Sequence, residues 1–331
     1  MTQRSGFGFY RPGVTGVPGA MGAPDVSADE VAAEPAYLSD DAHIDLAHDE
    51  VATRVGETLA RLDGELIGLG SVKQRVREIA SLLLVDRARE RFGLMTSKPT
   101  LHMSFTGGPG TGKTTVAMRM AEILHALGYL RTPKVHAVTR DDLVGQFIGQ
   151  TAPKTKEAIA KAAGGVLFID EAYALFRAEN ERDYGQEAIE ILLTEMENER
   201  GSLVVIFAGY ADRMGTLFEA NPGLSSRVPH HIAFSDYAAE ELMEIAERMV
   251  AKENFGFDAD ARAAFADYLD LRMAKPNFSN ARSVRNAIER TRLRHARRLV
   301  GLDRPLTKAD LTTLTADDVR GSSHFQTGDP A

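Results

Sequence analysis

The chain has 331 residues, of which 44% are hydrophobic and none is cysteine. This length allows one large or two modest domains, and the lack of thiols excludes disulfides, thiolate metal sites and cysteine nucleophiles. The sequence has no apolar run of the roughly 18 residues that span a bilayer and no apolar signal segment at its start, so we expect a cytoplasmic protein without a membrane partner.

The net charge of −8 is concentrated near the N-terminus. Residues 12–53 contain nine acidic residues and no Lys or Arg, and residues 1–11 carry Arg4 and Arg11, which leaves −1 for residues 54–331. A nearly neutral body argues against a general nucleic-acid partner, because such binding uses bulk positive charge. Since the start of the chain is also rich in Gly and Pro, we expect residues 1–53 to be a disordered extension, either a solvated tail or a short docking or self-association segment.

Helical patterns and then alternating strands and helices follow this extension. The pattern from Val51 to Phe92 is helical, with a break at residues 66–70. Short apolar runs predict strands at residues 101–106, 134–138, 166–170, 203–208 and 231–234. Alternation of this kind indicates an α/β fold in which helices flank a parallel five-stranded sheet, here within residues 54–235. Only helical patterns follow, so residues 236–331 are predicted to form a small all-helical domain with a flexible tail.

A glycine-rich loop follows the first predicted strand. The segment Gly107-Gly-Pro-Gly-Thr-Gly-Lys-Thr114 fits the phosphate-loop pattern G-x-x-x-x-G-K-[ST], in which glycines let backbone N–H groups surround a phosphate. Lys113 adds charge toward the β and γ phosphates, the Thr114 hydroxyl can ligate Mg²⁺, and the dipole of the following helix faces the anion. A turn that binds nothing is the alternative, which the flanking strand and helix disfavour. The predicted ATP-binding residues of this segment are Gly107, Gly108, Pro109, Gly110, Thr111, Gly112, Lys113, Thr114 and Thr115.

Two carboxylates end the third predicted strand. A buried parallel strand delivers its last residues to the C-terminal edge of the sheet, where ligands of such folds bind. We therefore predict that Asp170 binds the metal together with Thr114, and that Glu171, which extends further, polarises the attacking water. An isolated Asp-Glu pair is better explained as a solvated turn, but its position after a phosphate loop favours the catalytic interpretation.

A phosphate-loop sheet followed by a small helical domain resembles the AAA+ ATPases. Within them, the segments 141–155, 183–193 and 208–214 resemble the CbbX (CbxX/CfqX) branch, whose namesake is the red-type Rubisco activase, and the resemblance covers about residues 55–322. It implies a hexameric ring that hydrolyses ATP at its subunit interfaces. It also implies a substrate, inhibited red-type Rubisco, and a mechanism in which the C-terminal tail of the Rubisco large subunit is pulled through the pore to release a bound sugar phosphate. Ribulose 1,5-bisphosphate is implied as an activating ligand.

The same resemblance assigns roles to single residues. Arg227 falls where the family has an arginine finger that acts on a neighbouring protomer, and such a finger neutralises charge during phosphoryl transfer. Arg282 matches the sensor-2 arginine of the lid, and Arg285 is the second candidate. The segment Phe147-Ile148-Gly149 resembles the pore loop that grips polypeptides, although Phe147 by itself would suit a core position.

Two features leave alternatives open. The fourth strand ends in Ala208-Gly-Tyr210, where most AAA+ proteins have a polar sensor-1 residue, so Tyr210 either orients water or packs. Residues 272–298 carry nine Lys or Arg against one acid. They form either a solvated helix face, a site for a phosphorylated small molecule or a nucleic-acid strip. The family resemblance favours an effector site that includes Arg272 and Lys275, although Met273 stands where related chains often carry a further basic residue.

Two other functions compete with this interpretation. One is an ATPase of a type VII secretion system, but such proteins resemble longer chains with an added N-terminal helical-repeat domain. The other is a nucleotide-dependent scaffold that does not remodel its partner. Glu171 and Arg227 count against a scaffold, because neither is needed to bind a nucleotide without hydrolysis.

Overall fold

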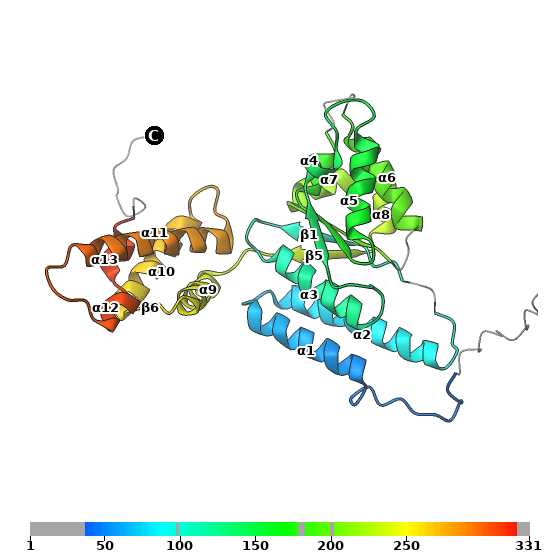
Figure 1. Cartoon of the computed structure of the whole chain (residues 1–331), viewed down its shortest axis with the longest axis horizontal. Coiled ribbons are helices and arrows are strands. Elements are labelled where there is room, and N and C mark those ends of the chain that lie inside the picture. The colour runs from blue at the N-terminus through cyan, green and yellow to red at the C-terminus, as the bar shows by residue number, and fades with distance from the viewer. Residues whose placement is uncertain (1–36, 97–98, 178–182, 199–201, 323–331) are drawn as a thin grey trace, which may run out of the picture. The chain divides into compact units, whose positions relative to one another are not determined.

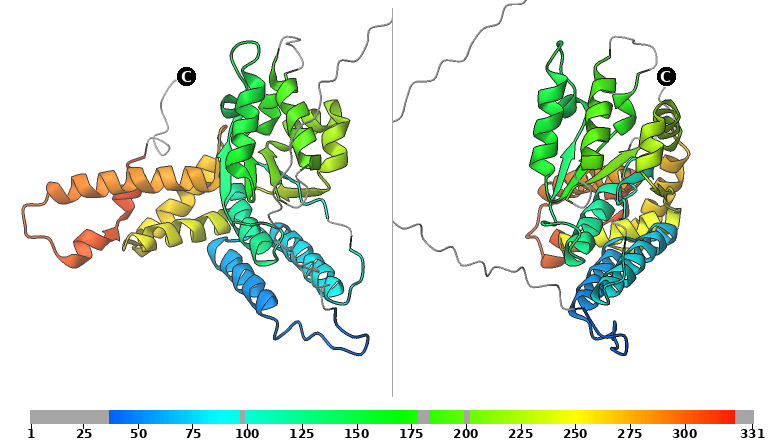
Figure 2. Two further views of the ribbon diagram at one scale, coloured as in Figure 1. Left: turned by 45° about the vertical axis from the view of Figure 1, so that its right-hand side comes forward. Right: turned by 90° about the vertical axis from the view of Figure 1, so that its right-hand side faces the viewer.

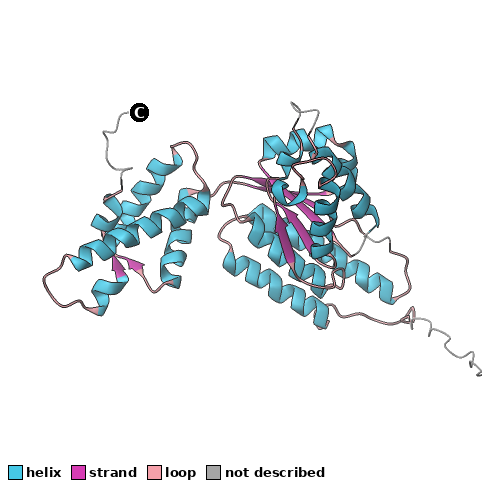
Figure 3. Cartoon of the chain, turned by 45° about the horizontal axis from the view of Figure 1, so that its top comes forward, coloured by secondary structure: helices cyan, strands magenta, loops and turns pink. Residues whose placement is uncertain are grey.

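The computed structural model describes residues 37–96, 99–177, 183–198 and 202–322. Its α/β part is built on one sheet whose five strands all run parallel, in the order β2-β3-β4-β1-β5 (Figure 1; Figure 3, strands in magenta). The strands are β1 (Met103–Gly107), β2 (Val135–Val138), β3 (Val166–Ile169), β4 (Val204–Gly209) and β5 (His230–Phe234). The predicted parallel five-stranded sheet is thus confirmed.

Helices cover both faces of this sheet, because alternate residues of its central strands are apolar on each side. Phe168 and Ile206 join one buried cluster, while Leu167 and Phe207 join the other. Residues of α1, α2 and α3 pack in the first cluster, and residues of α4 to α8 and the 3-10 turn η1 pack in the second. Figure 2 shows helices on both sides of the sheet. These elements are α1 (Glu50–Glu65), α2 (Gly70–Arg91), α3 (Lys113–Ala126), α4 (Arg140–Leu143), α5 (Thr151–Ala162), η1 (Ala172–Leu175), α6 (Gly185–Asn198), α7 (Ala211–Ala220) and α8 (Pro222–Arg227). Among the helices in the described ranges, none combines the length and the apolar character needed to cross a membrane.

Helix α1 begins inside the segment that we expected to be a disordered extension. The Asp49 carboxylate caps it by accepting hydrogen bonds from the backbone N–H groups of Val51 (2.9 Å) and Ala52 (3.1 Å). Val51 is buried in the core, so the last residues of the predicted extension 1–53 belong to the folded part. Residues 1–36 of that extension lie outside the described residues.

The domain that follows the sheet, called the lid below, is mainly helical, as predicted for residues 236–331, and it also contains one pair of short strands. Its helices are α9 (Ala239–Lys252), α10 (Ala259–Met273), α11 (Asn280–Val300), α12 (Lys308–Thr312) and α13 (Ala316–Arg320). Two short strands, β6 (Gly256–Phe257) and β7 (Thr313–Leu314), pair in parallel within it. The sequence did not indicate this pair, because two residues are too few to show the alternation that identifies a strand.

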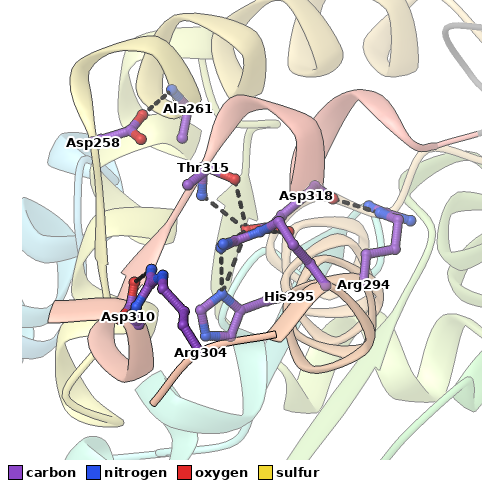
Figure 4. A network of polar contacts seen from close by, with 9 residues as sticks. Asp258, Ala261, Arg294, His295, Arg304, Asp310, Thr315 and Asp318 are labelled. Carbon is purple, nitrogen blue, oxygen red and sulfur yellow. Dashed lines mark hydrogen bonds and ion pairs between the residues drawn. The ribbon is translucent and has the colours of Figure 1, made fainter. Parts of the chain in front are cut away.

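A buried carboxylate fastens α13 to α11. Asp318 accepts hydrogen bonds from Arg298 Nε (2.9 Å) and Nη2 (2.8 Å). It also accepts from Thr315 N and Oγ1 (both 2.9 Å; Figure 4). Burial by itself raises the pKa of Asp318, but these hydrogen bonds outweigh it and bring the pKa to about 2. Asp318 is therefore ionised and paired at neutral pH.

Candidate active site

The phosphate loop joins β1 to α3, and two of its glycines cannot be replaced without a clash. A Cβ atom on Gly107 would lie 2.2 Å from the carbonyl oxygen of Phe234. One on Gly110 would lie 2.3 Å from the carbonyl oxygen of Ser279, and Gly110 also has a φ of +73°. The glycines thus let the loop pass close to the end of β5 and to the lid.

Lys113, the first residue of α3, is held at the mouth of this loop. Its Nζ donates hydrogen bonds to the carbonyl oxygens of Gly107 (2.9 Å) and Gly108 (2.7 Å). Burial lowers the pKa of Lys113, and the negative charge of Asp170 acts in the opposite direction. A partly desolvated cation is therefore positioned where a phosphate chain would lie on the loop.

The predicted nucleotide residues surround one cavity of about 520 Å³. Of the nine loop residues predicted for ATP binding, all except Gly108 line this cavity, and Gly108 contributes its carbonyl oxygen to Lys113. Asp170 lines the cavity as well. Glu171 also lines the cavity, and so do Arg282 and Arg285 from the lid. Both candidates for the sensor-2 arginine are thus at the site.

The end of β3 brings the two carboxylates to the cavity together. Glu171 has a left-handed backbone (φ +51°), and its N–H donates to Asp170 Oδ1 at 3.1 Å. Asp170 and Thr114 are both lining residues and supply one carboxylate and one hydroxyl. Mg²⁺ in phosphate-binding sites takes one or two protein oxygens and completes its shell with waters and phosphates, so this donor set fits it.

Tyr210 both packs and faces the cavity. Its ring lies 5.9 Å from that of Tyr173, and the guanidinium of Arg213 lies 5.5 Å from the Tyr210 ring and 5.0 Å from the Tyr173 ring. Tyr210 remains 37% exposed, and both tyrosines line the cavity. Sequence reasoning missed Tyr173 and Arg213, since only the fold brings η1 beside the start of α7.

A further contact that the sequence did not reveal joins the lid to the phosphate loop. Three successive loop carbonyls, those of Pro109, Gly110 and Thr111, accept hydrogen bonds from Asn280 Nδ2 (3.3 Å), Ala281 N (3.3 Å) and Tyr237 Oη (3.2 Å), respectively. Asn280 is 1% exposed and has a φ of +47°. The sequence indicated only that Asn280 belongs to the predicted helical domain.

The predicted pore loop has an exposed tip on an anchored base. Phe147 is 67% exposed and Ile148 86%, so Phe147 is not a core residue, and Gly149 adopts a φ of +80°. Below them, side chains of α5 bind the backbone of residues 141–145: Thr155 Oγ1 donates to Leu143 O (2.9 Å), Lys154 Nζ to Asp141 O (2.8 Å), and Thr151 Oγ1 accepts from Gly145 N (3.0 Å).

Arg227 does not line the cavity of its own chain. It ends α8, where its Nη1 donates to the Gly223 carbonyl oxygen at 3.3 Å and its Nε lies 3.4 Å from Glu197 Oε2. About a third of its side chain is exposed. The Arg227 side chain is thus partly exposed at the surface of the domain.

The two predicted effector residues lie at the end of α10. Arg272 donates to three successive carbonyl oxygens, those of Lys275 (3.5 Å), Pro276 (3.1 Å) and Asn277 (2.8 Å), and it lies over the Phe278 ring. Neither Arg272 nor Lys275 lines the nucleotide cavity. Arg272 therefore has a structural task in closing this helix end.

Two family models match the chain. The family described as "ATPase family associated with various cellular activities (AAA)" matches residues 103–236, and the AAA lid domain matches residues 238–329. A RuvB variant of Thermotoga maritima superposes with a TM-score of 0.50 at 24% identity, covering 75% of this chain and 70% of that one, and another with 0.51 at 22%, covering 80% and 71%. At these identities the two structures show the fold alone.

Curated relatives are much more similar. The plasmid-encoded protein CbxX of Cupriavidus necator is 62% identical over 289 residues, which cover 86% of this chain and 90% of CbxX. CbbX of Cereibacter sphaeroides is 57% identical, with coverage of 86% and 93%. The chloroplastic ribulose bisphosphate carboxylase/oxygenase activase of Cyanidioschyzon merolae is 56% identical, with coverage of 83% and 94%. The chain is therefore an ATP-hydrolysing enzyme that belongs to the AAA ATPases and, within them, to the CbxX/CbbX family.

Proposed function

We propose that this ATPase remodels inhibited red-type Rubisco in the cytoplasm, releasing a tightly bound sugar phosphate. The observation that carries the proposal is that one domain combines a nucleotide cavity containing Glu171 with an exposed aromatic loop tip at Phe147. A similar protein from Cyanidioschyzon merolae is named a Rubisco activase. In the proposed motor, ATP hydrolysis at the cavity drives movement of the loop tip, which pulls on a protein.

The hydrolysis step follows from the residues around the cavity. Lys113 and the backbone N–H groups of the loop would hold the phosphates, and Thr114 and Asp170 would hold Mg²⁺, which supplies positive charge to the β and γ phosphates. Glu171 would orient and deprotonate the attacking water from the other side. Removal of one such base typically costs about 10² to 10⁴ in rate.

The proposed assembly is a hexameric ring. Arg227 lies outside the cavity of its own protomer, and in the ring it would reach the γ-phosphate held by its neighbour. Arg282 would contact the phosphates from the lid of the same chain that holds them. Hydrolysis would then require a completed interface between protomers.

Force would reach the substrate through the pore loop. Phe147 and Ile148 would grip the C-terminal tail of the Rubisco large subunit, because an aromatic side chain buries much surface at a low cost in rotamer entropy and accepts many sequences. The hydrogen bonds from α5 to residues 141–145 would carry the pull from the domain to the loop tip. A loose loop would bend instead.

We also propose that ribulose 1,5-bisphosphate activates the enzyme, with Arg272 and Lys275 as its contacts. Titration of ATP turnover with this ligand separates the effector role of Arg272 from its helix-closing role. Arg272→Ala should shift the activation curve by about tenfold or more while the basal rate persists, since a hydrogen bond to a charged group is worth about 1.5 to 3 kcal/mol. Overlapping curves would assign Arg272 to the helix end alone.

The decisive experiment uses purified red-type Rubisco inhibited by a bound sugar phosphate. Carboxylation should recover with the protein and ATP, and it should not recover with a non-hydrolysable ATP analogue. Glu171→Gln is the matched control, because it should bind Mg-ATP with unchanged affinity and yet restore no carboxylation. Hydrolysis of ATP by the wild-type protein without any recovery of Rubisco would refute the proposed substrate.

A further inference from the structure

The phosphate loop is bound on its outer side by the lid and by the segment that leads into it. The carbonyl oxygens of Pro109, Gly110 and Thr111 accept hydrogen bonds from Asn280, Ala281 and Tyr237. In a trans peptide the N–H points opposite to the C=O of the same peptide unit. The N–H groups of residues 110, 111 and 112 therefore point away from the lid groups that hold these carbonyls, and loop N–H groups of this kind bind phosphates.

Asn280 makes more contacts in this arrangement than any other side chain in it. Its Nδ2 donates both to Pro109 O (3.3 Å) and to Asp236 Oδ1 (2.7 Å), and its Oδ1 accepts from Tyr237 N (3.0 Å). The reverse amide orientation would put an oxygen against a carboxylate and an NH₂ group against an N–H, so this orientation is fixed by its partners. One amide thus joins the loop, the end of the sheet and α11.

The backbone of Asn280 also indicates a specific task. Its φ of +47° lies in the left-handed region, which costs energy for residues other than Gly and is tolerated best by Asn and Asp. Buried residues in that region concentrate at functional sites, where the surrounding contacts hold them. Here the strained residue comes two positions before Arg282, which lines the nucleotide cavity.

We propose that Asn280 is a positioning residue that couples the phosphate loop to the lid, so that ATP affinity and the placement of Arg282 both depend on it. A loop whose carbonyls are held by the lid has its N–H groups oriented before the nucleotide arrives. Nucleotide binding should also affect the lid, because a nucleotide that orders the loop favours the lid position in which these hydrogen bonds form. This inference concerns ATP binding and hydrolysis, and it does not depend on Rubisco as the substrate.

The hydroxyl of Tyr237 supplies an independent contact of the same kind. Burial raises the pKa of Tyr237 to about 12, so the hydroxyl keeps its proton and donates to Thr111 O at any pH at which the enzyme works. Tyr237→Phe removes this single hydrogen bond and keeps the ring. We expect a few-fold weaker ATP binding from it, in the same direction as the Asn280 variants.

The test is a set of substitutions at Asn280 measured by calorimetric binding of a hydrolysis-resistant ATP analogue and by steady-state ATP turnover. Asn280→Gly keeps the left-handed backbone accessible and deletes the amide, and it should weaken binding by about tenfold and also lower kcat. Asn280→Asp places a carboxylate against Asp236 and should be worse than Gly. Asn254→Gly is the control, because Asn254 is also left-handed (φ +60°) but is exposed and does not line the cavity.

Two further arms distinguish positioning from simple support of the fold. Asp236→Asn combined with Asn280→Asp restores a donor and an acceptor in exchanged places, and it should bind ATP more tightly than Asn280→Asp alone. In an Arg282→Ala background, Asn280→Gly should lower kcat much less than in the wild type, since the residue that it places is already gone. The proposal would be overturned if folded Asn280→Gly kept the wild-type ATP affinity and kcat. It would also be overturned if its losses of affinity and kcat were fully explained by a lower melting temperature. If Asn280→Gly fails to fold, two other results together would overturn the proposal. These are wild-type ATP affinity in Tyr237→Phe and no tighter binding in the double variant Asp236→Asn/Asn280→Asp than in Asn280→Asp.

Discussion

Arg140 and Asp183 form an ion pair between the start of α4 and the segment that precedes α6 in the α/β domain. Arg140 Nη2 lies 2.5 Å from Asp183 Oδ1, and its Nη1 donates to Ala174 O at 2.7 Å. Arg140 begins α4, which leads to the pore loop, whereas Ala174 lies in η1, directly after Glu171. The guanidinium therefore connects the backbone beside Asp170 and Glu171, the proposed catalytic carboxylates, to the base of the proposed pore loop.

Removing one partner of this ion pair should destabilise the protein, because both side chains are largely buried, with exposed fractions of 15% and 7%. Arg140→Ala should lower the free energy of unfolding by about 3 kcal/mol, since it leaves a buried carboxylate without its main partner. The double variant with Asp183→Ala should lose less than the two single variants added together. Denaturant unfolding measures each value.

The exposed pair of Arg75 and Glu78 provides the comparison, with side chains 43% and 49% exposed. Glu78→Ala should change the unfolding free energy by less than about 1 kcal/mol. An Arg140→Ala variant that loses no more than Glu78→Ala would show that the Arg140 pair adds nothing to stability.

Arg227 should act on the nucleotide of a neighbouring protomer. Arg227→Ala should leave ATP binding to a single protomer unchanged and lower turnover by about 10³-fold or more. Mixing it with Lys113→Ala should restore activity, since about a quarter of the interfaces in random mixed rings would combine an intact loop with an intact arginine. Turnover of the mixture is compared with the sum of the two separate activities, and equality of the two would refute action in trans. Arg262→Ala, at an exposed lid arginine, controls for loss of surface charge.

The Asp318 network gives the lid a defined sensitivity to acid (Figure 4). The folded pKa of about 2 lies below the unfolded value near 3.9, so the pairing stabilises the protein fully above pH ~4 and is lost as the pH falls toward 2. This contribution amounts to about 2 to 3 kcal/mol at neutral pH.

Unfolding free energies of the wild type and Asp318→Asn, measured from pH 7 downward, should converge between pH ~4 and ~2. Asp303→Asn, at an exposed carboxylate that precedes α12, should run parallel to the wild type over the same range. A constant gap between the wild type and Asp318→Asn down to acid unfolding would contradict the assignment.

The sequence was sufficient for features that are encoded locally. The five strands were identified because each is a short apolar run. The phosphate loop was recognised by its fixed spacing, and Asp170 was proposed because it ends one of these apolar runs after a phosphate loop. The contacts of Asn280 and the pair of Arg140 and Asp183 were not predictable, because their partners lie tens of residues away and meet only in the folded chain. For Arg272 the contact is local but was still not predicted. A run of basic residues does not reveal that this guanidinium binds the backbone at the end of its own helix.

The most direct test of the account measures ATP turnover and recovery of inhibited Rubisco in one reaction, for the wild type and Phe147→Ala. Leu293→Ala is the control, because Leu293 is an apolar side chain that is 72% exposed on the lid. We expect Phe147→Ala to hydrolyse ATP at a rate near that of the wild type and to recover no Rubisco, and we expect Leu293→Ala to keep both activities. Full Rubisco recovery by Phe147→Ala, or equal loss of turnover and recovery, would contradict the proposal that Phe147 transmits the force.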